Sequence, residues 1–138
     1  MKELKIAKEV AEVEYDRFLE QMDLLIDPND MELEDKSNYQ KTRARIIRAI
    51  CRGHLVINDD GEAVYTPQHP KSVYKEPITF HERSGASVVV MDGKKKDHDI
   101  SKGYAAMAEM CRIQPKNFAT MVGEDIKICE AIFALLMD

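Results

Sequence analysis

The sequence lacks the features that mark several large classes of protein. No apolar run approaches the roughly 18 residues that a membrane-spanning helix needs. Charged side chains occur throughout residues 1–16 without an apolar core between them, so we expect no signal peptide. The 3 cysteines, Cys51, Cys111 and Cys129, do not follow the spacing of a disulfide framework. Their apolar surroundings predict free, buried thiols in a reducing cytoplasm.

The motifs of common active sites are missing as well. The chain contains no G-x-S-x-G, P-loop, G-x-G-x-x-G or H-E-x-x-H sequence. The cysteines lie in apolar helical stretches, where burial raises the pKa of a thiol instead of activating it. We therefore expect no catalytic residue and no cofactor, and we predict that the chain is not an enzyme.

The composition that remains is typical of a single globular domain. Apolar residues make up 44% of the 138 residues, which is enough to build a hydrophobic core. We predict one domain over 1–138, with an amphipathic helix and acidic connector (1–35), a basic helix and β-region (36–92) and C-terminal helices (93–138). The formal net charge of -5 disfavours a dedicated nucleic-acid binder.

The first predicted helix covers residues 3–26. We expect Pro28 to end it, because proline cannot continue a helix and biases Asp27 away from helical geometry. Residues 27–35 then form an acidic connector. The apolar stripe that predicts the helix repeats at steps of three and four and consists of Leu4, Ala7, Ala11, Tyr15, Phe18, Met22 and Leu25.

A second helix is predicted over residues 37–52. Ser37 or Asn38 is expected to cap its start, and Gly53 is well placed to stop it. Its apolar face consists of Ile46, Ile47, Ile50 and Cys51.

Residues 52–67, RGHLVINDDGEAVYTP, predict a β-hairpin. Asp60-Gly61 between two β-prone runs is typical of a two-residue type I′ turn, which needs positive φ at both central positions. That turn would place Ile57 opposite Val64 and Val56 opposite Tyr65. A further strand is predicted over residues 77–82.

The rest of the chain is expected to be mostly helical. Residues 84–92 favour either a strand or a short helix, and residues 93–99 a solvated turn. A helix should start at Asp97 or Asp99, with Ile100, Tyr104, Met107, Ala108 and Cys111 on one face. Pro115 should open a short helical turn, and Gly123 should separate it from a last helix. The predicted fold class is α+β, mainly helical, with a small sheet that contains the hairpin.

Two weak metal patterns are better explained by structure. The acidic loop Asn58–Glu62 offers oxygen ligands, but its acids are consecutive, whereas a calcium loop alternates them. Cys51 and His54 have a metal-like spacing, but tetrahedral zinc needs a second pair and the other histidines are isolated. We therefore predict no metal site.

A basic stripe on the second helix supports a nucleic-acid hypothesis. Residues 36–53 carry six basic side chains and no acid, and a helix of this kind could neutralise several phosphates. Residues 1–35, however, hold twelve acidic and four basic groups and could pair with it, so we favour a solvated or internally paired face. The candidate contacts are Lys41, Arg45, Arg48 and Arg52.

The order of features from Arg48 onward resembles a known family. RAICRGHLVINDDGEAVYTP, followed by PITFHERSGASVVVMD and ISKGYAAMAEMCRIQPKNFATMVGEDIKICEAIFALLMD, is similar to tail assembly chaperones of long-tailed bacteriophages and prophages. The shared order is an arginine-rich helix, a glycine, a strand, an acidic turn, a β segment, a short apolar segment and three helical pieces. SVVVM is more β-prone than the usually helical segment of the family.

The resemblance implies a non-enzymatic assembly factor. Such proteins coat the tape measure protein, keep it soluble and help recruit tail tube subunits in the host cytoplasm. They are absent from the finished particle, and many also occur in a longer, frameshifted form. No membrane partner is implied.

The last predicted helix is apolar almost all round and must be buried by its own domain or by a partner. We expect Ile126, Cys129, Phe133 and Leu136 to face the core. The other apolar face is then the hypothetical surface for a partner or for self-association, and it consists of Ile128, Ile132 and Leu135.

Overall fold

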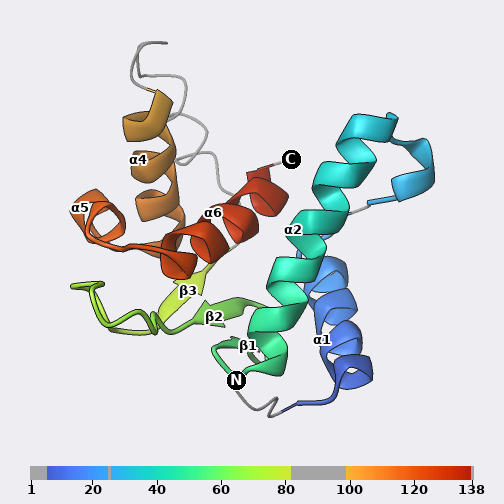
Figure 1. Cartoon of the computed structure of the whole chain (residues 1–138), viewed down its shortest axis with the longest axis horizontal. Coiled ribbons are helices and arrows are strands. Elements are labelled where there is room, and N and C mark those ends of the chain that lie inside the picture. Colours follow the sequence, from blue (N-terminus) through green and yellow to red (C-terminus); the bar gives the residue numbers. More distant parts are fainter. Residues whose placement is uncertain (1–5, 25, 82–98, 138) are drawn as a thin grey trace.

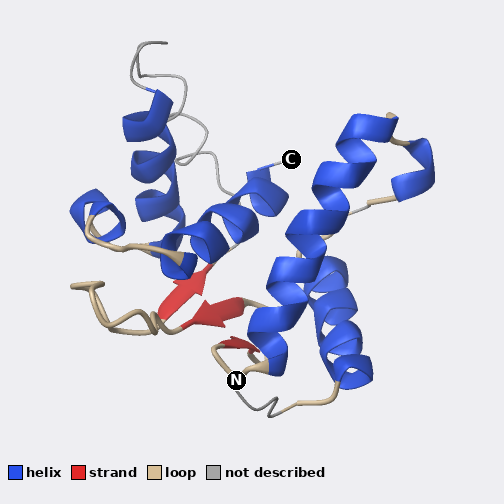
Figure 2. Cartoon of the chain, viewed as in Figure 1, coloured by secondary structure: helices blue, strands red, loops and turns tan. Residues whose placement is uncertain are grey.

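The computed structural model describes residues 6–24, 26–81 and 99–137, and its fold class is the α+β, mainly helical one that the sequence predicts. Helices α1 and α2 pack side by side, while α4, α5 and α6 gather on the other side of the molecule (Figure 1). A small sheet joins the two groups at one end (Figure 2). The elements are α1 (Lys8–Gln21), the 3-10 turn η1 (Pro28–Asp30), α2 (Leu33–Cys51), β1 (Leu55–Ile57), β2 (Ala63–Tyr65), β3 (Ile78–Phe80), α4 (Asp99–Cys111), α5 (Pro115–Ala119) and α6 (Glu124–Met137).

Helix α1 ends earlier than the proline rule predicts. Asp23 adopts a left-handed conformation with φ of 55°, and Leu24 N–H donates to Leu19 C=O over 2.9 Å. This is the Schellman arrangement, which satisfies the last carbonyls of a helix. The prediction that Pro28 ends the helix is therefore wrong, and Pro28 instead opens η1.

The same motif ends two other helices. Gly53, with φ of 77°, closes α2, and His54 N–H donates to Ala49 C=O over 3.1 Å, so the predicted stop is confirmed. Arg112, with φ of 59°, does the same for α4. The start of α2 was misplaced, because the helix begins at Leu33 and contains the expected caps Ser37 and Asn38.

The hairpin is present, but its turn is longer than predicted. Leu55 pairs with Tyr65, Val56 with Val64 and Ile57 with Ala63, so the expected register is wrong by one residue. Asn58 N–H donates to Glu62 C=O over 2.9 Å, which leaves a three-residue loop between them. Among the described residues of this loop only Gly61 has positive φ, at 80°.

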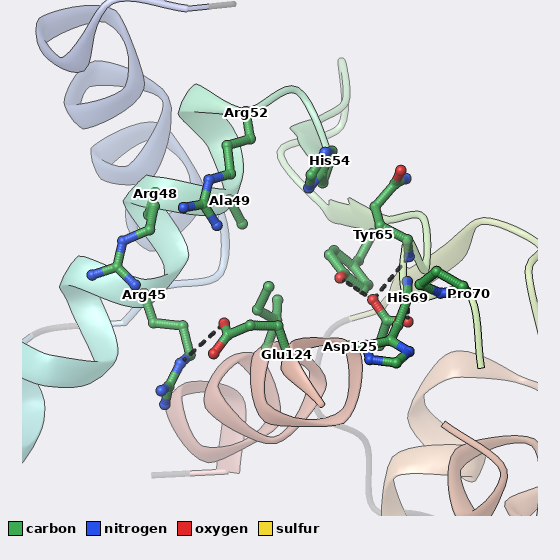
Figure 3. Close-up of a pocket in the computed structure, with 12 residues that line it drawn as sticks. Arg45, Arg48, Ala49, Arg52, His54, Tyr65, His69, Pro70, Glu124 and Asp125 are labelled. Atoms are coloured by element: carbon green, nitrogen blue, oxygen red, sulfur yellow. Dashed lines mark hydrogen bonds and ion pairs between the residues drawn. The ribbon is translucent and has the colours of Figure 1, made fainter. Parts of the chain in front are cut away.

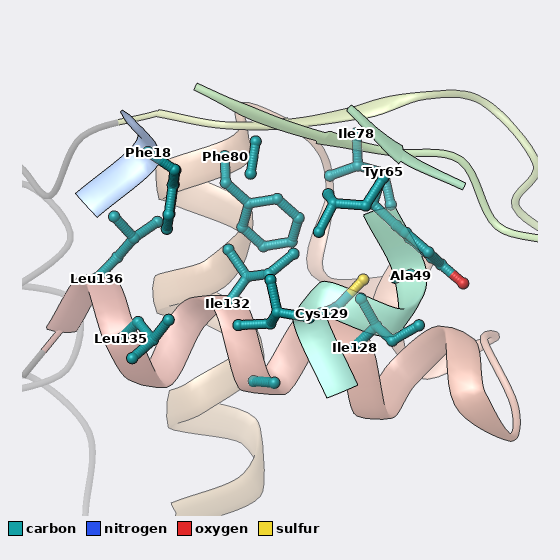
Figure 4. Close-up of a cluster of buried hydrophobic side chains, with 14 of the residues drawn as sticks. Phe18, Ala49, Tyr65, Ile78, Phe80, Ile128, Cys129, Ile132, Leu135 and Leu136 are labelled. Atoms are coloured by element: carbon teal, nitrogen blue, oxygen red, sulfur yellow. The ribbon is translucent and has the colours of Figure 1, made fainter. Parts of the chain in front are cut away.

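The strands form an antiparallel sheet in the order β1-β2-β3, and β3 confirms the strand predicted over residues 77–82. Helix α6 runs along this sheet, and their apolar side chains meet in between (Figure 4). Tyr65, Ile78 and Phe80 from the strands are all at most 1% exposed. The sheet and α6 therefore share one hydrophobic core.

The apolar face of α6 that was expected to bind a partner is buried in its own domain. Ile128 is 4%, Ile132 0% and Leu135 5% exposed, so the expectation that they form an outward partner-binding face is wrong. The sheet covers one side of the helix and α2 packs against another, so the face of Ile128, Ile132 and Leu135 is buried within the domain (Figure 4). Cys129 and Leu136 are buried as expected, whereas Ile126 and Phe133 are only partly buried.

The other predicted apolar faces are confirmed where the structure describes them, with two exceptions. Ala7 is exposed and precedes the first residue of α1, and Tyr104 of α4 is only partly buried. Ala11, Tyr15, Phe18 and Met22 of the first stripe are buried, as are the four predicted apolar residues of α2. Phe118 and Met121 are buried in and after α5. The predictions for Leu4, Leu25 and the segments 84–92 and 93–98 concern positions outside the described residues.

Candidate functional site

A buried carboxylate joins α6 to the loop 66–72. Asp125 lies in the first turn of α6 and is 1% exposed. Its oxygens accept hydrogen bonds from the Tyr65 hydroxyl (2.6 Å), the Ser72 hydroxyl (2.7 Å) and the backbone N–H groups of Gln68 (2.8 Å) and His69 (2.9 Å). A single side chain therefore holds the end of β2 and the loop that follows it (Figure 3).

The electrostatics of this carboxylate suit a structural role. Burial alone would raise the pKa of Asp125, but the hydrogen bonds from Gln68, Tyr65, Ser72 and His69 outweigh burial and lower it. Burial and the bond to this carboxylate raise the pKa of Tyr65. Asp125 is therefore ionised at neutral pH, and its charge is stabilised by four donors.

A basic pocket lies next to this carboxylate. It is a cavity of about 240 Å³ between the C-terminal half of α2, the loop 66–72 and the start of α6. Arg45, Arg48 and Arg52 line it from the end of α2, and Glu124 stands between Arg45 and Asp125 (Figure 3). Its lining residues are Arg45, Arg48, Ala49, Arg52, His54, Tyr65, Gln68, His69, Pro70, Glu124, Asp125 and Ile128.

The arginines of the pocket differ in exposure, and one of them forms an ion pair. Arg48 is exposed and Arg52 half-buried. Arg45 Nε lies 3.4 Å from Glu124 Oε2, which is close enough for an ion pair. The N–H is nevertheless not aligned for a hydrogen bond, so this buried nitrogen has no hydrogen-bond partner in the described part of the chain. Glu124 itself is 45% exposed, and such pairs contribute little stability.

Only part of the predicted basic stripe lines the pocket. Three of its members line the pocket, whereas Lys41 is exposed on α2 and lies outside it. Pairing with the acidic N-terminal region occurs through Arg43, which lies 3.2 Å from Glu12 and over the ring of Tyr15, with 5.4 Å between Arg43 Cζ and the ring centroid.

The cysteines and one of the histidines considered as metal ligands are buried or bonded to other side chains. All three cysteines are buried and free, as predicted, and burial raises the pKa of Cys111 and Cys129. His81 Nδ1 lies 2.7 Å from Glu62 Oε2. Within residues 6–24, 26–81 and 99–137, no group of three His, Cys, Asp or Glu side chains could hold a metal ion.

The acidic loop behaves as a turn. The Asn58 side chain accepts hydrogen bonds from the N–H groups of Asp60 and Glu62, both over 2.9 Å. Arg17 of α1 donates to the carbonyls of Ile57 (2.7 Å) and Asn58 (2.8 Å) and so fastens the hairpin end to α1.

A second concave surface lies between the N-terminal half of α2 and the C-terminal half of α6. This α2–α6 groove has a volume of about 510 Å³. Apolar atoms of Met31, Tyr39 and Leu135 are combined there with the carboxylates of Glu32 and Asp35. The complete lining is Met31, Glu32, Asp35, Asn38, Tyr39, Thr42, Ala134 and Leu135.

The residues that sequence reasoning missed are those of the carboxylate network. Asp125 lies 60 positions along the chain from Tyr65 and 53 from Ser72. An acid in the first turn of a helix is common, because it suits the helix dipole, so Asp125 carried no distinguishing signal.

None of the helices in the described ranges has the length and apolarity needed to cross a membrane. Comparison with protein-family models, curated proteins and solved structures found no match to this chain.

Proposed function

We propose that this chain is a tail assembly chaperone of a long-tailed bacteriophage or prophage, which coats the tape measure protein and helps recruit tail tube subunits. The observation that carries the proposal is the resemblance over residues 48–138. Over this range the described elements are, in order, the end of α2, β1, β2, β3, α4, α5 and α6, and the short apolar segment of the resemblance lies outside the described residues. On this proposal the protein acts in the host cytoplasm, binds without a cofactor and is absent from the virion.

The partner surface that we propose is the α2–α6 groove. Ile128 and Ile132 of the face first expected to bind are core, whereas Leu135 lies at the edge of the groove, where Met31, Tyr39 and Ala134 offer apolar surface beside α6. Leu33 at the start of α2 is 84% exposed and extends the apolar surface available at this end of the helix. A partner helix with apolar side chains and basic flanks fits such a groove, because Glu32 and Asp35 carry negative charge along it.

Co-expression with the tape measure protein of the same phage tests this proposal. Ala134 is exposed and lines the groove, so Ala134→Glu places a charge against the apolar partner without disturbing the core. We expect the amount of tape measure protein that co-purifies to fall by about tenfold or more, since desolvating an unpaired charge at an interface costs over 1.4 kcal/mol.

Ala119→Glu is the matched control, because Ala119 is also an exposed helical alanine but lies away from the groove. It should leave co-purification unchanged. If the native chain neither co-purifies with the tape measure protein nor keeps it in the soluble fraction, the proposed function is wrong. If both variants bind normally, the function stands and the groove is not the surface.

A second candidate is binding of nucleic acid through Lys41, Arg45, Arg48 and Arg52. The observation in its favour is that Arg48 is exposed and lines an open pocket with two further arginines. A gel-shift titration at two salt concentrations tests it. Salt-sensitive binding that is lost when Arg45 and Arg48 are changed to Ala would favour this candidate.

A further inference from the structure

The basic pocket combines donors from three separate parts of the chain. Arg45, Arg48 and Arg52 come from one helix, His54 from the segment before β1 and His69 from the loop after β2. Guanidinium groups present planar pairs of N–H donors that match the oxygens of phosphate. The cavity, at about 240 Å³, admits a small oxyanion but encloses no long polymer.

His69 lines the same pocket, and its ring is held in place by its neighbours. Its Nδ1 accepts a hydrogen bond from Lys71 N–H over 3.1 Å, so in the neutral ring the proton is on Nε2. The ring packs against Gly123, where an added Cβ would lie 2.9 Å from His69 Cδ2. Because Gly123 also has φ of 62°, a larger residue there would be strained and would displace the ring.

Two carboxylates also line the pocket, and they differ in how firmly they are held. Asp125 has four hydrogen-bond donors directed at its oxygens, so its charge is already stabilised. Glu124 is 45% exposed and approaches Arg45 without a hydrogen bond. Three guanidinium groups against two carboxylates leave a formal charge of +1 before the histidines are counted.

We propose that this pocket binds a phosphoryl oxyanion, with Arg48 and Arg52 as its main contacts and Glu124 as an internal competitor that the ligand displaces from Arg45. Because the Arg45–Glu124 pair lacks an aligned hydrogen bond, breaking it costs little free energy. A phosphate oxygen in line with the Nε–H of Arg45 would form the hydrogen bond that Glu124 does not. The proposal is independent of the partner groove, which lies on the other half of α2.

Calorimetric titration of the full chain with inorganic pyrophosphate tests the site. We expect saturable binding that weakens about tenfold in Arg48→Ala, because a charge-assisted hydrogen bond is lost. Glu124→Gln should bind about threefold more tightly, since it removes the competing charge. Lys41→Ala is the matched control and should leave the affinity unchanged, because Lys41 is a basic residue of the same helix outside the pocket.

A single-stranded oligonucleotide without terminal phosphates distinguishes the source of the phosphoryl group. If it binds with the same dependence on Arg48 and competes with pyrophosphate, the ligand is the nucleic-acid backbone. If only pyrophosphate binds in this way, the ligand is a small phosphate compound.

The proposal is overturned if pyrophosphate does not bind at millimolar concentration, or if Lys41→Ala weakens binding as much as Arg48→Ala. It is also overturned if an acidic peptide binds in the pocket and pyrophosphate does not. Circular dichroism checks that each variant is folded. Glu124 is half-exposed, so Glu124→Gln still decides the matter if Arg48→Ala does not fold.

Discussion

The two loops that flank β2 are stabilised in opposite ways. The loop between Asn58 and Glu62 is shaped by its own residues, because the Asn58 side chain bonds the N–H groups of Asp60 and Glu62. The loop 66–72 is shaped by Asp125, which is more than fifty positions away and reaches it from α6. The first loop is therefore a local structure, whereas the second forms only when α6 is in place.

Because of this difference, the two loops depend on different parts of the molecule. The local loop is closed on itself and fastened to α1 by Arg17. The long-range loop positions His69 beside the basic pocket and connects the sheet to the terminal helix. Any ligand or partner that moves α6 would therefore affect the second loop and spare the first.

The largest effect is expected from Asp125→Ala. It leaves the buried hydroxyls of Tyr65 and Ser72 and two backbone N–H groups without their acceptor. The free energy of unfolding should fall by about 3 kcal/mol or more, which urea denaturation can measure. A loss below about 1 kcal/mol would mean that water replaces the carboxylate and that the loop is not held from a distance.

The pH dependence of stability should report the same carboxylate. The pKa of Asp125 is lower in the folded chain than in the unfolded chain, where it is about 3.9. Its contribution is therefore complete above the unfolded pKa and is lost as the pH falls through the folded pKa. Urea midpoints should fall more steeply on acidification for the native chain than for Asp125→Asn. Parallel curves would contradict the lowered pKa.

A smaller effect is expected at the local loop. Asn58→Ala removes two hydrogen bonds to exposed or half-buried backbone N–H groups that water can reach, and a longer one of 3.3 Å from Asn58 Nδ2 to Glu62 Oε1. The free energy of unfolding should fall by about 1 kcal/mol. Asp59→Ala at the exposed tip of the loop is the control and should change stability by less than about 0.5 kcal/mol. If Asn58→Ala costs as much as Asp125→Ala, the contrast between the loops is wrong.

The helix ends illustrate how far local chemistry predicts the fold. Gly53 was recognisable as a stop, because glycine adopts left-handed geometry without strain. Asp23 and Arg112 adopt the same left-handed geometry, which is sterically unfavourable for residues with a Cβ. Their residue types therefore did not predict that the helices end there. The start of α2 was equally hard to predict from the sequence, because its N-cap Glu32 forms no side-chain capping hydrogen bond.

The candidate site was only partly visible beforehand. The stripe of Arg45, Arg48 and Arg52 follows from helical spacing, which the structure confirms. The convergence of His54, His69 and Glu124 on that stripe depends on how β2 and α6 pack, which no spacing along the chain specifies.

The amino-acid sequence by itself determined the fold class, the apolar faces of α1 and α2, the hairpin and the basic stripe, because each depends on side chains a few positions apart. Only the tertiary structure decided that Ile128, Ile132 and Leu135 are core and that Asp125 is buried. A helix that is apolar all round has no preferred face until its neighbours are present, and a carboxylate becomes buried only where distant donors gather around it.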